Sequence, residues 1–494
     1  MNLLWRTRLT ALGASSLAIV LGLWLADGNY GAPLLLCGIA GAACVVALSG
    51  VQLDTAVLGG LLFGYIVGNR GFAQFSLLPG LPALPAEVGL VVCSAWLVVA
   101  SAMGRRLPFQ RDALNFFVIL WIVIGSIRII PDLRAYGIVA LRDFATVYYA
   151  TFFFIAQAQS SREASRRFLE RCLLAAIVVV IPLAELFRHF PEFFLGTLVF
   201  AGIPFIYFKG DLLATFMAVG IVIAHRRWEA SRRVIWLLIA LGGFVGVLIT
   251  SSRASLLGLL TAIAWLAISR RTMLLRTLLG ATLAGALIFI GAIAIEITSS
   301  RDNFAFSVYE RALSIADISG HRSYVNADIE SKGDNNRFRM IWWQAAVEET
   351  IDGNPWFGLG FGHDLAAGFI RRYYPEHDEE FSARSPHCIF VTIFGRMGAI
   401  GLIAFLGIVA VMCCRTWSVL HASVRNEAHA TAWVLPWVVL VSAAFGVVLE
   451  GPMGAVIFWS LLGMAAGTQK SIVTETPTLP DAAQAPAGMA AIHG

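Results

Sequence analysis

The feature that most constrains this chain is a series of long apolar runs joined by short turns, several of them basic. Residues 9–26, 113–130 and 388–413 each contain at most one charged residue. Only 14% of the 494 residues are charged, against roughly 25% in soluble proteins. Because a helix needs about 20 apolar residues to cross a bilayer, the sequence predicts an all-α polytopic transmembrane bundle of about 12–14 spans.

Basic residues gather on one side of these runs. Arg6 and Arg8 precede the first run, and Arg226, Arg270 and Arg415 lie in later turns that span counting places on the same side. Since basic turns remain in the cytoplasm, both termini are expected to be cytoplasmic. The net charge of +5 reflects this orientation and says little about partners. No nucleic-acid partner is expected.

Residues 298–387 differ from the rest, because they carry charged and polar side chains in the proportions of a soluble protein. They are expected to form one long loop on the outer side that contains short helices. Residues 335–351 should form one such helix, with Trp342, Trp343 and Ala346 on an apolar face.

The chain divides into four regions on this pattern. Residues 1–233 and 406–470 are expected to form N-terminal and C-terminal transmembrane helices, and the region 234–405 between them includes the outer loop. Residues 471–494 are rich in Ala, Pro and Thr and are expected to form a disordered cytoplasmic tail. The seven cysteines show no spacing typical of a metal site, so neither a metal nor a cofactor is expected.

Arg253 is the first candidate for a binding residue. It stands at the outer end of a run, after Thr250-Ser251-Ser252, and Ser and Thr favour helix N-caps. Free backbone N–H groups and the positive end of the helix dipole gather at such a position, where a guanidinium completes a phosphate-binding site. The alternative is an interfacial arginine that only reaches toward the headgroups.

His387 is the candidate general base. It follows Pro386 at the expected first turn of a membrane helix, with Ser385 as the expected cap. The positive helix end disfavours imidazolium, so this histidine should be neutral near pH 7 and able to accept a proton. The alternative is a structural histidine.

Charged residues also occur inside a run. Arg142 and Asp143 are adjacent within residues 137–156, and charges at that depth are costly unless they are paired or face a wet cavity. They are expected either to form an ion pair that orients the helix or to line a substrate cavity. Arg339 and His363 are further candidates for that lining.

Four motifs then occur in a characteristic order. They are Ser252-Arg253-Ala254-Ser255 at the outer end of a span, Asn354-Pro355-Trp356-Phe357-Gly358-Leu359-Gly360, Pro386-His387, and Gly395-Arg396-Met397-Gly398-Ala399-Ile400-Gly401. This order resembles the O-antigen ligase and Wzy-type polymerase superfamily. Its members show a Ser-Arg-Gly-like step, a "dhPllGvGlgnf"-like stretch, a His-Asn pair and an "elGllGl"-like helix. The resemblance covers residues 234–405.

The resemblance implies a multi-pass glycosyltransferase of the bacterial inner membrane that works at the periplasmic face without a metal. Its donor would be an undecaprenyl diphosphate-linked glycan, and its acceptor a glycan or lipid A core. Membrane lipid would surround it. By position, Arg253 and Arg337 match the arginines that hold the diphosphate, and His387 matches the base. The chain departs from the family pattern in having Ala254 for Gly, Cys388 for Asn and Arg396 where Glu is common.

The sequence leaves three other functions open. The sequence does not distinguish a ligase from a polymerase of exopolysaccharide or O-antigen repeat units. A transporter of lipid-linked glycans would also need charges in a membrane cavity, although transporters commonly carry related halves, which this chain does not show. A structural scaffold would leave Arg253, Arg337 and His387 dispensable. The oligomeric state is not predicted.

Overall fold

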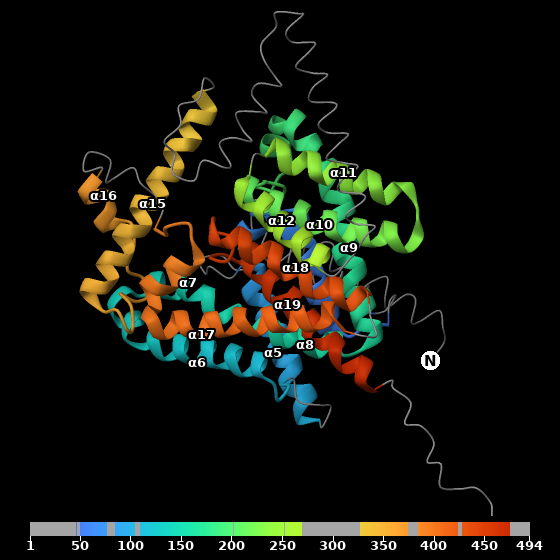
Figure 1. Ribbon diagram of the computed structural model, residues 1–494, viewed down its shortest axis with the longest axis horizontal. Helices are drawn as coiled ribbons and strands as arrows, with labels where there is room; N and C mark the ends of the chain where they lie inside the picture. The colour runs from blue at the N-terminus through green and yellow to red at the C-terminus, as the bar shows by residue number, and fades with distance from the viewer. Residues whose placement is uncertain are drawn as a thin grey trace, which may run out of the picture.

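The computed structural model describes residues 46, 50–76, 84–103, 109–200, 202–250, 252–268, 327–373, 384–422 and 427–474. Most of this part of the chain is helical, so the predicted all-α class is confirmed (Figure 1). In chain order the elements are α3 (Leu53–Val67), α4 (Arg70–Gln74), α5 (Pro85–Ala102), α6 (Ala113–Tyr136), α7 (Ile138–Tyr148), α8 (Thr151–Ser160), α9 (Glu163–His189), η1 (Phe193–Thr197), β1 (Val199–Phe200), β2 (Ile203–Pro204), α10 (Gly210–Ser231), α11 (Val234–Ile249), α12 (Arg253–Ile268), α15 (Ala327–Gly353), α16 (Ala367–Tyr373), α17 (Ile389–Leu420), α18 (Glu427–Ala444) and α19 (Pro452–Thr474).

Within these residues, four helical segments are long and apolar enough to span a membrane. They are Pro85–Ala102, Ala113–Tyr136, Ile138–Ser160 and Ile389–Leu420. Shorter apolar helices accompany them at Leu53–Val67, Val234–Ile249, Arg253–Ala267, Ala428–Ala444 and Pro452–Thr468. The chain is therefore a multi-pass membrane protein. The run 9–26 lies outside the described residues, as do 277–297 and nearly all of 33–48, which are also expected to span, so the total number of spans and the position of the termini remain predictions. The expected disordered tail 471–494 begins too early, because residues 471–474 are the helical end of α19. Residues 475–494 lie outside the described residues.

The predicted run 137–156 is not one continuous helix. Helix α7 ends at Tyr148 and α8 begins at Thr151. The hydroxyls of Tyr148 and Tyr149, at the break, donate to Glu87 Oε1 on α5 at 2.8 and 2.5 Å. The break between α7 and α8 could not be read from hydropathy, because the residues on both sides of it are apolar and the contacts at the break are made to another helix.

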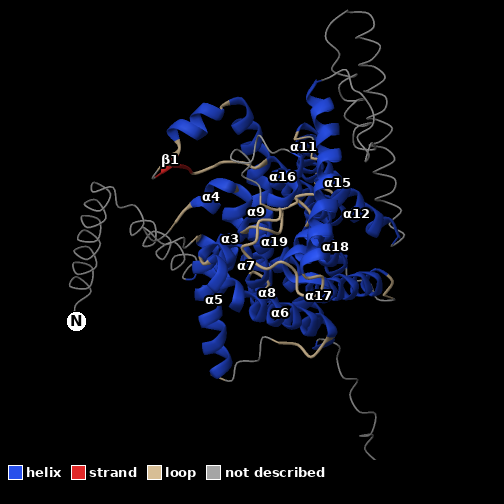
Figure 2. Ribbon diagram, turned by 90° about the vertical axis from the view of Figure 1, so that its left-hand side faces the viewer, coloured by secondary structure: helices blue, strands red, loops and turns tan. Residues whose placement is uncertain are grey.

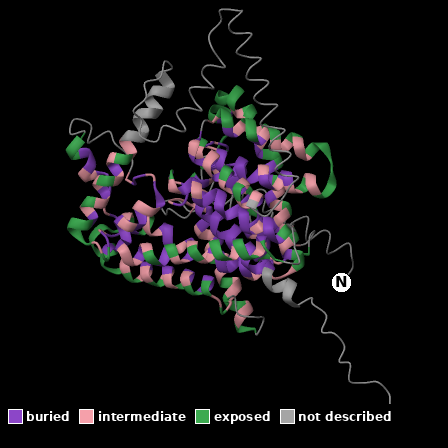
Figure 3. Ribbon diagram, in the orientation of Figure 1, coloured by how far each residue is buried: buried purple, intermediate pink, exposed green. Residues whose placement is uncertain are grey.

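The most buried part of the bundle lies where α8, α10, α18 and α19 meet (Figure 3). Helix α19 approaches α8 closely, because a Cβ atom on Gly463 would lie 2.2 Å from Phe153 O and one on Gly467 would lie 2.6 Å from Gln157 O. Small residues permit such backbone approach in membrane bundles, where lipid supplies no hydrophobic driving force between helices.

Helices α15 and α16 stand beyond the end of the bundle, at the left of Figure 1. The helix predicted at residues 335–351 is present and extends over Ala327–Gly353. Its predicted apolar face is confirmed at Trp342 and Ala346, which are each 1% exposed, whereas Trp343 is only partly buried. The Trp342 ring stacks on Phe369 of α16, with 5.6 Å between centroids and 11° between planes.

At the edge of the bundle, β1 and β2 form an antiparallel hairpin within the loop that precedes α10 (Figure 2). Asn69, which is fully buried, joins this loop to the start of α4. Its Oδ1 accepts hydrogen bonds from Arg70 N and Lys209 N, both at 3.0 Å. The bond to Lys209 fixes the position at which α10 begins.

Helix α17 is broken at Gly398, which has a φ of 64°. The break is filled by the backbone of the glycine-rich loop that follows α15. Ala399 N donates to Pro355 O at 2.8 Å and Ile400 N to Trp356 O at 3.2 Å, while Gly395 O accepts from Leu359 N at 2.7 Å. The loop thereby satisfies groups that an unbroken helix would pair internally.

Two glycines make this contact possible. A Cβ atom on Gly358, with a φ of 72°, would lie 2.6 Å from Arg396 C, and one on Gly398 would lie 2.3 Å from Trp356 C. Side chains of α6 support the loop from the other side. Arg128 Nε donates to Phe357 O at 3.0 Å, and Asp132 Oδ2 accepts from Phe361 N at 2.7 Å.

We predict that Gly398→Ala lowers the thermal stability of the purified protein substantially. A non-glycine residue in left-handed backbone costs about 1–3 kcal/mol, and the added methyl group would also overlap backbone atoms, which cannot rotate away. Gly60→Ala is the matched control, because nothing lies within 4 Å of its Cβ position in α3. Equal melting temperatures for the two variants would show that α17 and the loop are not interlocked.

Candidate functional site

His387 lies just before α17 rather than in its first turn. The helix begins at Ile389 with Cys388 as its N-cap residue, which makes no side-chain capping bond. His387 itself has a φ of 56°, which is uncommon for a residue other than glycine. Ser385 does not cap the helix as predicted, because its hydroxyl instead donates to Glu450.

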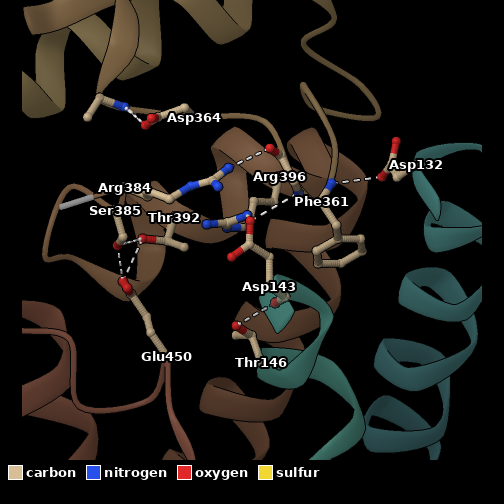
Figure 4. Close-up of polar contacts among 12 residues, drawn as sticks. Asp132, Asp143, Thr146, Phe361, Asp364, Arg384, Ser385, Thr392, Arg396 and Glu450 are labelled. Carbon is tan, nitrogen blue, oxygen red and sulfur yellow. Dashed lines mark hydrogen bonds and ion pairs between the residues drawn. The ribbon is translucent and has the colours of Figure 1, made fainter. Parts of the chain in front are cut away.

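Helix α15 holds the segment that carries His387. Trp343 Nε1 donates to Pro386 O at 2.5 Å. The rings of Trp342 and His387 are in contact, with 5.6 Å between centroids and a 52° tilt. Arg384 Nη2 donates to Gly362 O at 2.6 Å, which joins the same segment to the glycine-rich loop (Figure 4). These contacts give the strained backbone at His387 the support that such a conformation requires from its surroundings.

Cations surround the imidazole. Burial first, and then the positive charges of Arg339 and Lys209, lower the pKa of His387 to about 4, while Asp211 acts in the opposite direction. The ring is therefore neutral at pH 7, as predicted. The physical cause differs from the predicted one, since burial and then neighbouring cations lower the pKa, rather than the dipole of a helix that His387 does not join.

Arg339, on α15, lies near both the bundle and the histidine. Its Nη1 donates to Phe445 O at 2.9 Å, beyond the end of α18. Its Nε is buried and has no hydrogen-bond partner among the described residues. Burial lowers the pKa of Arg339, and Asp211 opposes that shift.

Two helix starts meet beside these groups. Ser255 Oγ on α12 donates to Asp211 O on α10 at 3.1 Å. Ser252 precedes α12, and its Oγ accepts from Ser255 N at 3.4 Å. Ser252 therefore caps α12 as predicted, although the helix begins at Arg253 rather than one residue later.

The side chain of Arg337 lies outside the part of the chain that the structure describes. The predicted convergence of Arg253 and Arg337 on one anionic group therefore remains a prediction. The nearby cations that the structure does place around His387 are Arg339, expected only as a lining residue, and Lys209, which sequence reasoning missed. Lys209 could have been noticed as the cation that directly precedes the apolar run of α10.

Glu450 is a second residue that sequence reasoning missed. It lies between α18 and α19, and its Oε1 accepts hydrogen bonds from Ser385 Oγ and, at 2.9 Å, from Thr392 Oγ1 (Figure 4). Burial raises the pKa of Glu450, while the bond from Ser385 and the charge of Arg396 oppose that rise. It is the one charged residue in positions 432–466, and this isolation between two apolar runs was the available signal.

The charges within the predicted run 137–156 are paired differently from the prediction. Asp143 forms an ion pair with Arg396 of α17, and its Oδ2 also accepts from Gly362 N at 3.0 Å (Figure 4). Its sequence neighbour Arg142 is exposed. His363 hydrogen-bonds Glu349 at 2.9 Å. Asp143 thus has a structural partner in Arg396.

Comparison with known protein families matches residues 237–406 to the O-antigen ligase family. This region is an O-antigen ligase domain. The resemblance inferred from the motif order is confirmed. Members of this family are membrane enzymes of glycosyl transfer, of ligase or polymerase type. A search of the curated proteins finds no match to the chain.

The O-antigen ligase domain supplies only part of the site. Arg253, Arg339 and His387 lie within the matched residues, whereas Lys209, Asp211 and Glu450 come from helices on either side of it. The ion pair beside the glycine-rich loop also joins the domain to the rest of the chain, because Asp143 precedes the domain and Arg396 belongs to it. The surrounding helices are therefore part of the site's architecture.

We predict that Asp143→Asn and Arg396→Gln each destabilise the protein strongly. Both side chains are at least 90% buried, and removing one partner of a buried ion pair costs about 3–5 kcal/mol because the other charge is left uncompensated. Arg142→Gln is the control on the adjacent, exposed position. Unfolding midpoints of the purified variants measure the effect. The double variant should lose less than the two single losses added together, and full additivity would show that the pair does not interact.

Proposed function

We propose that this protein transfers an undecaprenyl diphosphate-linked oligo- or polysaccharide to an acceptor hydroxyl at the periplasmic face of the bacterial inner membrane. The observation that carries the proposal is His387, a neutral imidazole set among Arg339 and Lys209 at the α15 end of an O-antigen ligase domain. The basic turns at the opposite helix ends support a periplasmic position for this end.

The cations have the chemistry that departure of a lipid diphosphate requires. The leaving group gains negative charge as the glycosidic bond to phosphate breaks, and preorganised positive groups stabilise that charge. Arg253 and Arg337 are proposed to hold the diphosphate, and Arg339 and Lys209, whose charges act on His387, are proposed to add to the same field. Bidentate guanidinium groups suit phosphate oxygens. No step requires a metal ion.

His387 is proposed to take the proton of the acceptor hydroxyl. As that proton moves to the imidazole, the acceptor oxygen forms a bond to the anomeric carbon, and the bond from that carbon to the diphosphate oxygen breaks. The products are the glycosylated acceptor, undecaprenyl diphosphate and a protonated His387 that later loses its proton to water. Attack opposite the leaving group inverts the anomeric centre.

The donor itself would make the base effective. An imidazole with a pKa of about 4 accepts a proton poorly near pH 7. A bound diphosphate would neutralise the cations that lower this pKa, and would therefore raise it toward the working pH. Proton transfer is then favoured only after the donor is in place.

Between the two types of transfer, we propose the ligase reaction, in agreement with the description of the matched family. Glycan profiling of a deletion strain distinguishes the alternatives. A ligase leaves lipid-linked polymer and bare acceptor when it is lost, whereas loss of a polymerase removes the ladder of repeat units and leaves single units.

We predict that His387→Ala lowers transfer about 10²–10⁴-fold, the usual contribution of a general base. The assay is transfer from undecaprenyl diphosphate-linked glycan by purified protein, normalised to folded protein, with donor binding measured separately. His363→Ala is the matched control, because that histidine pairs with Glu349. Retained turnover in His387→Ala would remove the base assignment, and lost donor binding with unchanged chemistry would move His387 to the diphosphate site.

We predict that Arg339→Gln moves the acid limb of kcat/KM to higher pH. This limb reports the pKa of the base in the free enzyme, about 4 for His387, and activity falls as the pH drops through it. Removing the positive charge of Arg339 raises that pKa, so inactivation begins at higher pH. Arg142→Gln should leave the limb in place. A pH profile of Arg339→Gln with an unmoved limb would show that Arg339 does not act on the base.

A further inference from the structure

A second polar site lies at the other end of the bundle. A cavity of about 230 Å³ opens between α9, α10, α18 and α19. Helix α10 contributes Lys209 and Asp211 near its start to the surroundings of His387, but Ile223 to Ala230 near its end to this cavity. Arg226 lies 15 positions after Asp211 on this helix, so the two sites are roughly 23 Å apart along it, at about 1.5 Å per residue.

The cavity lies at the basic ends of α9 and α10. Its lining comes from the first turns of α9 and α18, from the last turns of α10 and from the middle of α19. Because basic turns remain in the cytoplasm, the cavity belongs at the boundary between headgroups and acyl chains of the inner leaflet.

The lining is divided between charge and apolar surface. Arg166, Arg226 and Arg227 line the cavity together with a single acidic side chain, Glu170, whereas much of the wall is aliphatic, from Leu173, Leu435, Leu461 and Met464 among others. The volume is many times the roughly 10–15 Å³ that one water needs by the same measure.

Part of this positive charge is already compensated. Arg166 pairs with Glu163 and, at 3.0 Å, with Glu170. Glu229 also acts on Arg226. Among the described residues no acidic side chain pairs with Arg227, so the lining keeps a net positive charge.

Orientation in the membrane explains basic turns, but it does not explain a cavity beneath them. Arg171 and Arg233 belong to the same basic turns and do not line the cavity. Arginines above an apolar cleft between membrane helices have the form of a site for a lipid headgroup. A free anion would gain nothing from the aliphatic wall.

We propose that this cavity binds an anionic phospholipid of the cytoplasmic leaflet, with its phosphate at Arg226 and Arg227 and the start of an acyl chain against Leu435 and Met464. The site is separate from glycan transfer, and its test does not depend on the proposed activity. It would hold these four helices together in a membrane that contains such lipids.

The experiment measures thermal unfolding of the full chain in phosphatidylcholine nanodiscs to which phosphatidylglycerol is added. The unfolding temperature should rise with the phosphatidylglycerol fraction. Arg226→Gln/Arg227→Gln should lose most of that rise, whereas Arg171→Gln/Arg233→Gln, with the same charge change on the same turns, should keep it. Glu170→Gln should strengthen the response, because it removes the acidic group from the cavity.

Any of three results would overturn the proposal. The first is an equal response of the two double variants to phosphatidylglycerol. The second is the same rise in unfolding temperature when inorganic phosphate is added to phosphatidylcholine nanodiscs, and the third is the same rise when extra phosphatidylcholine is added in place of phosphatidylglycerol. If Arg226→Gln/Arg227→Gln does not fold, native mass spectrometry of the wild-type protein decides. It should retain phosphatidylglycerol in preference to phosphatidylcholine after detergent removal, and equal retention would reject an anionic site.

Discussion

A helix that breaks within a membrane protein must still satisfy its backbone polar groups, because lipid offers them no partners. In this chain the requirement is met by backbone hydrogen bonds between α17 and the glycine-rich loop that follows α15. Gly398 interrupts the helix, and Pro355, Trp356 and Leu359 supply backbone partners around the break. The remainder of the site depends on this junction, since Arg384 and His387 are positioned against the loop and α15 that it anchors.

Positive charge occurs at both ends of the bundle, with different surroundings at each. Around His387 the cations Lys209 and Arg339 accompany an imidazole and the hydroxyls that bind Glu450, so an anion held there meets groups able to move a proton. Around Arg226 the neighbours are aliphatic. The first arrangement suits chemistry on a diphosphate, and the second suits retention of a lipid. Charge alone would not have distinguished them.

Much of the fold could be predicted from the sequence, because hydropathy and helical periodicity are local properties. The apolar face of α15 at Trp342 and the cap at Ser252 follow from residues a few positions apart. The pairing of Asp143 with Arg396 could not be predicted, since the two lie 253 positions apart and Asp143 has an adjacent alternative in Arg142. The left-handed backbone at His387 was equally inaccessible, because non-glycine residues adopt it only when tertiary contacts impose it.

The break in α17 also divides that helix between two mechanical units. The residues before Gly398 are hydrogen-bonded to the glycine-rich loop through Gly395, whereas residues farther along the helix, such as Ile408, belong to the core of the bundle. The short stretch that leads from His387 into the membrane is therefore attached to the loop side as well as to its own helix. A disturbance of α15 can reach the imidazole through the Trp342 ring and through the bond from Trp343 to Pro386, without crossing the membrane core.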